Sequence, residues 1–127
     1  MRLLLDTHVV LWVMRDADEL GAQARELIAQ ADVVYVSAAS LWEVAIKSAL
    51  GKLPIDPVRL QQQLTLAGFE SLSVTWSHAA AVHSLPHHHR DPFDRLLIAQ
   101  AMTEPLHLLT RDAALQAYTP LVKLLPA

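Results

Sequence analysis

The chain contains no cysteine, which excludes disulfide bonds and sites that bind zinc or iron through thiolates. Only three glycines occur among its 127 residues, and no glycine-rich loop of the phosphate-binding kind is present. The longest unbroken apolar run, Val9–Met14, is far too short to cross a bilayer, and Asp6 interrupts the stretch where the core of a signal peptide would form. We therefore expect a cytoplasmic protein with no membrane segment, folded as a single domain over residues 1–127.

The net charge of −3 argues against a protein that binds nucleic acid through a broad basic face. That argument weakens if Asp6, Glu43, Asp91, Asp94 and Asp112 share one metal site. Eight acidic residues then remain against ten lysines and arginines, and the rest of the molecule carries a charge of +2. A nucleic-acid substrate is therefore compatible with the composition.

Apolar periodicity predicts strands and helices in alternation. The predicted strands are Arg2–Leu5, Val33–Val36, Glu70–Val74, Leu106–Thr110 and Leu121–Leu124. The predicted helices are Thr7–Arg15, Leu20–Ala31, Ala38–Leu50, Val58–Ala67, Ser77–Ser84, Pro92–Glu104 and Asp112–Ala117. Strands separated by helices favour right-handed crossovers, so we predict an α/β fold: one three-layer α/β/α domain with a central, mostly parallel sheet.

In such a sheet, ligands bind beyond the carboxyl ends of the strands, near the point where the strand order reverses. The residues that follow the predicted strands are therefore the first candidates for a site. Asp6 and Thr7 follow the first strand, Ser37 follows the second, and Thr110 and Asp112 end or follow the fourth. Two acidic residues thus emerge at the edge where a site is expected.

Each acidic residue also has a purely structural explanation. Asp6, Asp91 and Asp112 all precede predicted helices and are good N-caps, and Asp94 lies in the first turn after Pro92. Glu43 precedes Lys47 by four residues, which is the favourable order for an ion pair on a helix. Its neighbours in the sequence are markedly apolar, however, so a solvated position explains Glu43 less well than the others.

Taken together, the acidic residues favour a metal site. The predicted topology brings several helix starts to one crevice, and clustered carboxylates repel one another unless protons or cations neutralise them. Oxygen ligands, with no histidine or cysteine at metal-binding spacing, favour Mg²⁺ or Mn²⁺ over Zn²⁺. A site of this kind can activate water and stabilise charge on the oxygens of a phosphodiester, which indicates metal-assisted hydrolysis.

Four segments, Leu4–His8, Ser37–Lys47, Arg90–Ala101 and Leu109–Asp112, resemble a PIN domain, most closely the VapC-type ribonuclease toxins of bacterial toxin–antitoxin pairs. The resemblance covers nearly the whole chain and implies a metal-dependent endoribonuclease that cleaves RNA, forms a homodimer and is inhibited by a cognate antitoxin. It implies a Mg²⁺ or Mn²⁺ site formed by Asp6, Glu43, Asp94 and Asp112. Residues in supporting positions would be Asp91, Thr7, Ser40 and Thr110.

Several further residues have two interpretations each. Arg95, Arg111 and Lys47 are candidates for contacts with RNA phosphates, or for ordinary surface ion pairs. The run His87–His89 has the composition of a transition-metal site. It also precedes the helix at Pro92, so its loop either overhangs the site and contacts RNA or is simply solvated. Trp12 and Trp42 either pack in the core or line a groove between the first and third helices that accepts the antitoxin.

Two other function classes share this size and sheet type. An aspartyl-phosphate phosphotransfer domain would need a second acid beside Asp6, but the sequence there is Asp6-Thr7-His8, and Ser37 rather than an aspartate follows the second strand. A non-catalytic module that binds RNA or protein is the other alternative. The complete set of four acidic residues favours catalysis over this alternative.

Overall fold

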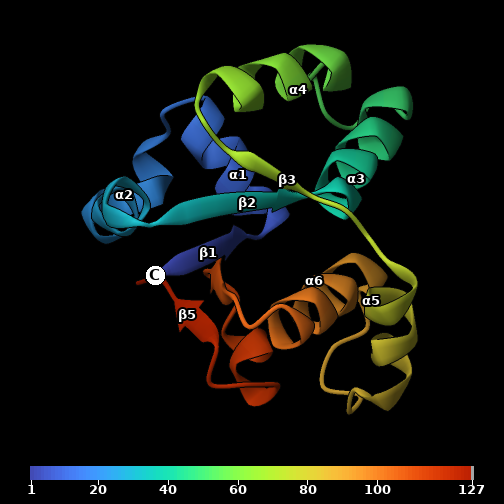
Figure 1. Cartoon of the computed structure of the whole chain (residues 1–127). Coiled ribbons are helices and arrows are strands. Elements are labelled where there is room, and N and C mark those ends of the chain that lie inside the picture. The colour runs from blue at the N-terminus through green and yellow to red at the C-terminus, as the bar shows by residue number, and fades with distance from the viewer. Residues whose placement is uncertain (127) are drawn as a thin grey trace.

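The computed structural model describes residues 1–126 as a five-stranded sheet with helices on both faces (Figure 1). The strands are β1 (Arg2–Leu5), β2 (Val33–Ser37), β3 (Glu70–Leu72), β4 (His107–Thr110) and β5 (Val122–Leu124). The α-helices are α1 (Thr7–Met14), α2 (Gly21–Gln30), α3 (Ala38–Ala49), α4 (Pro57–Leu66), α5 (Trp76–Ala81) and α6 (Pro92–Thr103). Short 3-10 helices occupy Asp18–Leu20, Val82–Ser84 and Ala113–Ala117. Within the described residues, no helix combines the length and apolar character needed to span a membrane.

The strand order is β3-β2-β1-β4-β5, and each neighbouring pair is parallel. In the centre of the sheet, Leu4 pairs with Tyr35 of β2 on one side and with Leu108 of β4 on the other. The chain first builds the sheet outward from β1 through β2 to β3 and then returns to add β4 on the opposite side of β1. The topological switch point therefore lies between β1 and β4, as the predicted α/β fold requires.

The sheet divides the core into two apolar layers. Alternate residues of a strand point to opposite faces, so Leu3 and Leu5 pack in one layer while Leu4 packs in the other. Side chains from α1, α2, α3 and α4 cover the Leu3 and Leu5 face. Side chains from α6 and the C-terminal segment cover the Leu4 face, and α5 packs beside α6 (Figure 1). The three-layer arrangement predicted from the sequence is thus confirmed.

Short polar residues begin most of the helices. The side chains of Asp6, Ser37, Asp56, Thr75 and Asp91 each accept a hydrogen bond from a backbone N–H in the first turn of the following helix. Pro57 and Pro92 occupy the first helical position, where the missing N–H costs nothing. At the other end of α3, Gly51 has φ +71°, a conformation that glycine adopts without steric cost. These boundaries match the sequence prediction closely.

The differences from the sequence prediction lie in short elements. The helix predicted over Ser77–Ser84 divides into α5 and a 3-10 helix, and the short helix after Asp112 is 3-10 as well. The third strand ends at Leu72 rather than Val74. Periodicity distinguishes an apolar face but does not distinguish α from 3-10 hydrogen bonding in segments of about one turn.

The packing predicts a large difference between two Leu→Ala substitutions. Leu4 is fully buried in the central strand, so Leu4→Ala should lower the free energy of unfolding by about 2–5 kcal/mol through lost burial and cavity formation. The matched control is Leu66→Ala at the exposed end of α4, where the leucine is 88% exposed and the change should stay within about 0.5 kcal/mol. Urea denaturation of both variants measures this, and equal losses would contradict the assigned core.

Candidate metal centre

The carboxyl ends of β1 and β4 are joined through the side chain of Asp6. The Asp6 N–H donates to the Leu109 carbonyl (3.1 Å), and its carboxylate accepts hydrogen bonds from the Thr110 hydroxyl and from the Val9 N–H at the start of α1 (2.9 Å). Asp6 is therefore both the N-cap of α1 and a buried acid at the switch point. The two interpretations of this residue are compatible.

Burial raises the pKa of Asp6 above its usual value, because the charged carboxylate loses contact with water. The hydrogen bonds from Thr110 and Val9 act in the opposite direction, as does the nearby His8, while the charge of Asp112 raises the pKa further. Burial is the largest of these effects. The ionised form of Asp6 is therefore energetically unfavourable in the folded protein.

Glu43 belongs to a second cluster, centred on the first two turns of α3. Its Oε1 accepts a hydrogen bond from the Thr7 hydroxyl (2.7 Å), and the Ser40 hydroxyl lies 3.0 Å from the same Thr7 oxygen. Its Oε2 accepts from Lys47 Nζ (2.9 Å), so the predicted ion pair on the helix is present. Glu43 is buried despite its charge, and each of its oxygens has a polar partner.

Lys47 connects the Glu43 cluster to the acids on α6. Its hydrogen bond with Glu43 raises the pKa of the ammonium group, burial lowers it, and the negative charges of Glu43, Asp91 and Asp94 raise it. The direction of the shift favours the charged form at all physiological pH values. Lys47 therefore contributes a permanent positive charge at the margin of an otherwise acidic crevice.

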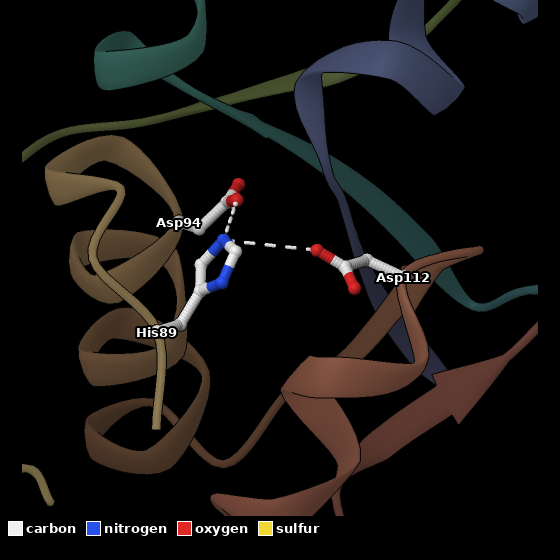
Figure 2. Close-up of side chains that lie close together, drawn as sticks. All are labelled: His89, Asp94 and Asp112. Atoms are coloured by element: carbon white, nitrogen blue, oxygen red, sulfur yellow. Dashed lines mark hydrogen bonds and ion pairs between the residues drawn. The ribbon is translucent and has the colours of Figure 1, made fainter. Parts of the chain in front are cut away.

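One group of ionisable side chains links α6, the loop before it and the end of β4. His89 Nε2 lies 2.8 Å from Asp94 Oδ2 and 3.7 Å from Asp112 Oδ2, and Figure 2 shows the imidazole pointing between the two carboxylates. Among residues 1–126, these three offer donor atoms that all lie within 4.8 Å of one another. A ring nitrogen placed between two carboxylate oxygens marks a position suited to a positive charge.

Burial raises the pKa of Asp94 to about 6, and the negative charges of Asp91 and Asp6 raise it as well. The hydrogen bond and the charge of His89 oppose the shift. Asp6, Asp94 and Asp112 therefore affect one another electrostatically although they come from three separate elements. The structure thus places the four acids at one edge of the sheet, with Glu43 linked to them through Thr7 and Lys47.

Asp91 lies beside this group as a helix cap. A single oxygen, Oδ1, accepts hydrogen bonds from the N–H groups of Phe93 (2.8 Å) and Asp94 (3.2 Å). The cap interpretation of Asp91 is therefore confirmed, and its charge reaches the site through its effect on Asp94. Thr110 has a similar supporting position, because its hydroxyl both donates to Asp6 and accepts from the Asp112 N–H (3.1 Å).

The structure corrects the expected phosphate contact of Arg95. This side chain is 9% exposed, and its guanidinium donates to the carbonyls of Val82, Leu85 and Pro86 and to the Tyr118 hydroxyl. Leu85 and Pro86 belong to the loop that leads to α6. Sequence position placed Arg95 next to Asp94, but on a helix the neighbouring residue points away from the site, here into the core.

Arg111 differs sharply from Arg95. Its guanidinium carbon lies 4.4 Å from the centroid of the Trp12 ring, a cation–π contact, and the ring of His8 lies 6.1 Å from that of Trp12. Arg111 Nε is buried without a hydrogen-bond acceptor, and within residues 1–126 no carboxylate forms a salt bridge with this side chain. Trp12 thus contacts the guanidinium of Arg111, the residue before Asp112. This guanidinium has no anionic partner in the described part of the chain.

One interpretation of Trp12 and Trp42 is a groove between the first and third helices, α1 and α3. An apolar pocket of about 490 Å³ lies instead between α3 and α4, over the ends of β2 and β3. Trp42 on its wall is exposed and packs edge-on against Phe93, with ring centroids 5.4 Å apart. Trp12 is partly buried against the core and carries Arg111. Trp42 therefore borders an apolar opening.

Sequence reasoning placed the loop of His87–His89 near the site but did not add His89 to the acidic centre. The expectation of a site without histidine considered only spacings within the motifs, and the structure brings His89 in from the loop before α6. The available signal was a run of three histidines ending two residues before Asp91. Nothing in the run distinguishes His89 from His87 or His88, because that choice depends on the direction of the loop backbone.

The donor set of this centre fits a divalent cation. Asp94 and Asp112 present oxygens to one point, Asp6 lies within electrostatic range of both, and the pKa values of Asp6 and Asp94 are raised. A cation between these groups would relieve their repulsion and favour their ionised forms. Carboxylate oxygens are the ligands that Mg²⁺ and Mn²⁺ prefer in proteins.

Comparison with known proteins gives a consistent family assignment. A profile of the PIN domain matches residues 3–119. The chain is 31% identical over 117 residues to Ribonuclease VapC22 of Mycobacterium tuberculosis, which covers 91% of this chain and 90% of that protein. Among solved structures, it resembles VapBC2 from Rickettsia felis bound to a DNA fragment from their promoter, with a TM-score of 0.70 and 16% identity over 98% of this chain and 97% of that one. A toxin–antitoxin complex from Klebsiella pneumoniae matches with a TM-score of 0.64 and 19% identity over 95% of both chains.

The raised pKa of Asp94 predicts that its charge destabilises the protein when cations are removed. The carboxyl ionises near pH 6 in the folded protein but near pH 4 in the unfolded chain, so the cost is absent below pH 4, grows between pH 4 and 6, and is complete above pH 6. In the presence of a chelator, Asp94→Asn should therefore be more stable than the wild type by about 2 kcal/mol at pH 7 and equally stable near pH 4.

Urea denaturation across this pH range measures the difference. Glu26→Gln, which removes an exposed carboxylate on α2, is the control and should follow the wild-type curve. A stability gain for Asp94→Asn that does not change with pH would contradict the assigned ionisation.

Proposed function

The chain belongs to the PIN-domain family of VapC-type ribonucleases, and from this premise we propose that its acidic centre hydrolyses RNA phosphodiester bonds with the help of Mg²⁺ or Mn²⁺. The protein is accordingly a ribonuclease toxin of a toxin–antitoxin system, and the aspartyl-phosphate and non-catalytic alternatives give way to this assignment. The observation that supports the proposed centre most strongly is the convergence of Asp6, Asp94 and Asp112 at the switch point of the sheet.

Each acid has a distinct part in the proposal. Asp94 and Asp112 face one point from α6 and from the end of β4, so they would hold the cation directly. Asp6 is fixed by Thr110 and by the first turn of α1, and it would complete the ligand set from β1. When bound, the metal ion supplies an activated water and stabilises negative charge on the leaving oxygen.

Glu43 would act at the margin of the cation site. Thr7 and Lys47 each engage one of its carboxylate oxygens, which fixes the side chain in a single orientation. From there, Glu43 can accept a hydrogen bond from water bound at the site and orient it toward the substrate. Ser40 supports this position through its contact with Thr7, and Asp91 supports Asp94 through the cap of α6.

We assign the contact with the RNA backbone to Arg111. Arg111 precedes Asp112 in the sequence, and its guanidinium lies on Trp12 and forms no salt bridge within the described residues. A guanidinium presents paired N–H donors that match the oxygens of a phosphate, and a fixed orientation lowers the entropy lost on binding. Lys47 adds positive charge near Glu43, Asp91 and Asp94.

Two protein partners are also proposed, an antitoxin and a second copy of the chain. The similar Klebsiella structure is a toxin–antitoxin complex. Large apolar side chains are exposed here as well: Trp42 and Val58 border the α3–α4 pocket, and Trp76 on α5 is 95% exposed. Exposed apolar side chains of this size are typical of surfaces that another protein covers.

Cleavage of RNA tests the proposed centre. Purified wild-type protein, freed of any inhibitor, should cut total cellular RNA in Mg²⁺ or Mn²⁺ and not in a chelator. Asp6→Asn and Asp94→Asn should each lower the cleavage rate by at least about a hundredfold, since they remove ligand oxygens. The matched control is Asp56→Asn, because Asp56 also caps a helix ahead of a proline but lies away from the acids. Cleavage that survives the chelator would contradict the proposal.

The assignment of Arg111 predicts a change in salt dependence. On protein that also carries Asp94→Asn, so that the RNA stays intact, Arg111→Ala should weaken RNA binding and reduce the slope of log affinity against log salt by about 0.7. Arg2 offers a matched control: it lies over Tyr35 (5.9 Å to the ring centroid) at the opposite end of β1.

Fluorescence anisotropy over a range of salt concentrations measures both slopes. Arg2→Ala should keep the full slope. An unchanged slope in Arg111→Ala would show that this guanidinium does not contact phosphate.

A further inference from the structure

His89 lies inside the acidic centre rather than at its border. Its Nε2 is 2.8 Å from Asp94 Oδ2 and 3.7 Å from Asp112 Oδ2, and in Figure 2 the ring points between the two side chains. These three residues supply the tightest group of ligand atoms found among residues 1–126. The imidazole nitrogen therefore faces the same point as the oxygens of both carboxylates.

Several contacts position the backbone that leads to His89. The buried guanidinium of Arg95 donates to the carbonyls of Leu85 and Pro86, just before the histidine run. The Tyr118 hydroxyl, which accepts from Arg95, lies 3.5 Å from the His89 carbonyl oxygen. The ring of His88 packs edge-on against the Tyr118 ring, 5.1 Å between centroids. These contacts orient the loop so that the His89 side chain faces the acids.

We propose that His89 Nε2 is a ligand of the divalent cation, which makes the centre a mixed nitrogen and oxygen site that selects Mn²⁺ over Mg²⁺. This inference rests on the proposed function and adds a residue and a metal preference to it. It also replaces the expectation of a site made of oxygen ligands alone.

The chemistry of the ring supports this assignment. In the structure, Nε2 faces two carboxylates and lies within hydrogen-bond distance of Asp94 Oδ2. With a cation bound, the neutral ring would carry its single proton on Nδ1, so that the Nε2 lone pair faces the ion, and a proton displaced from Nε2 would pass to solvent. Imidazole is a good ligand for first-row transition ions, whereas Mg²⁺ prefers oxygen and keeps much of its water. A fixed imidazole therefore adds affinity for Mn²⁺ and little for Mg²⁺.

Electron spin resonance of bound Mn²⁺ tests the proposal without measuring cleavage. Spin-echo modulation from a directly bonded ¹⁴N nucleus should appear in the wild-type protein and disappear in His89→Gln. The Mn²⁺ affinity of His89→Gln should fall at least about tenfold, while the Mg²⁺ affinity, measured by competition, should change less than about threefold. His87→Ala in the same loop and His8→Ala beside Thr7 are the matched controls and should keep the modulation.

The possible outcomes separate this inference from the proposed function. If the wild type binds Mn²⁺ but shows no ¹⁴N modulation, His89 is not a ligand, while the carboxylate site stands. If modulation persists in His89→Gln, another nitrogen is bound and the assignment is wrong. If the wild type binds no Mn²⁺, the proposed metal centre itself fails. Because the wild-type spectrum alone can overturn the proposal, the test does not depend on how well any variant folds.

Discussion

Repulsion among buried carboxylates is the constraint on which this end of the molecule depends. Burial and neighbouring negative charges raise the pKa of Asp6 and of Asp94, so both ions are costly to keep in the folded protein. Hydrogen bonds from Thr110, from the start of α1 and from His89 reduce this cost without removing it. These buried charges lower the stability of the folded protein. Cation binding neutralises them and restores part of that free energy, so this end of the molecule is well suited to bind a cation.

General features of a parallel α/β fold determine where the acids lie. Parallel strands end at one edge, the helices that follow need polar caps, and the β3-β2-β1-β4-β5 order brings the caps after β1 and β4 together. The positive side chains around the centre then have separate tasks. Arg95 supports the loop from the core, Lys47 engages Glu43, and Arg111 lies on Trp12 with no anionic partner among residues 1–126. Similar side chains near the acids thus differ in their contacts because they point in different directions.

Much of this arrangement follows from local rules. Apolar periodicity and helix caps predict the five strands and the positions of the acids, since Asp6, Asp91 and Asp112 are needed at helix starts in any case. The orientations and contacts of the Arg95 and His89 side chains could not be predicted in the same way. Arg95 turns inward because the backbone carbonyls of Val82, Leu85 and Pro86 accept hydrogen bonds from it, and His89 turns toward Asp94 because Tyr118 and Arg95 set the path of its loop. Both depend on contacts between segments that periodicity does not relate.

A crystal structure of the protein with Mn²⁺, phased on the anomalous signal of the metal, tests the central claim most directly. The account predicts an anomalous peak between Asp94 and Asp112 at the switch point of the sheet, with Asp6 oriented toward it. The peak should vanish from crystals of Asp94→Asn grown in the same way. A peak elsewhere on the molecule, or full anomalous density in the Asp94→Asn crystals, would contradict the claim that these carboxylates are gathered to hold a cation.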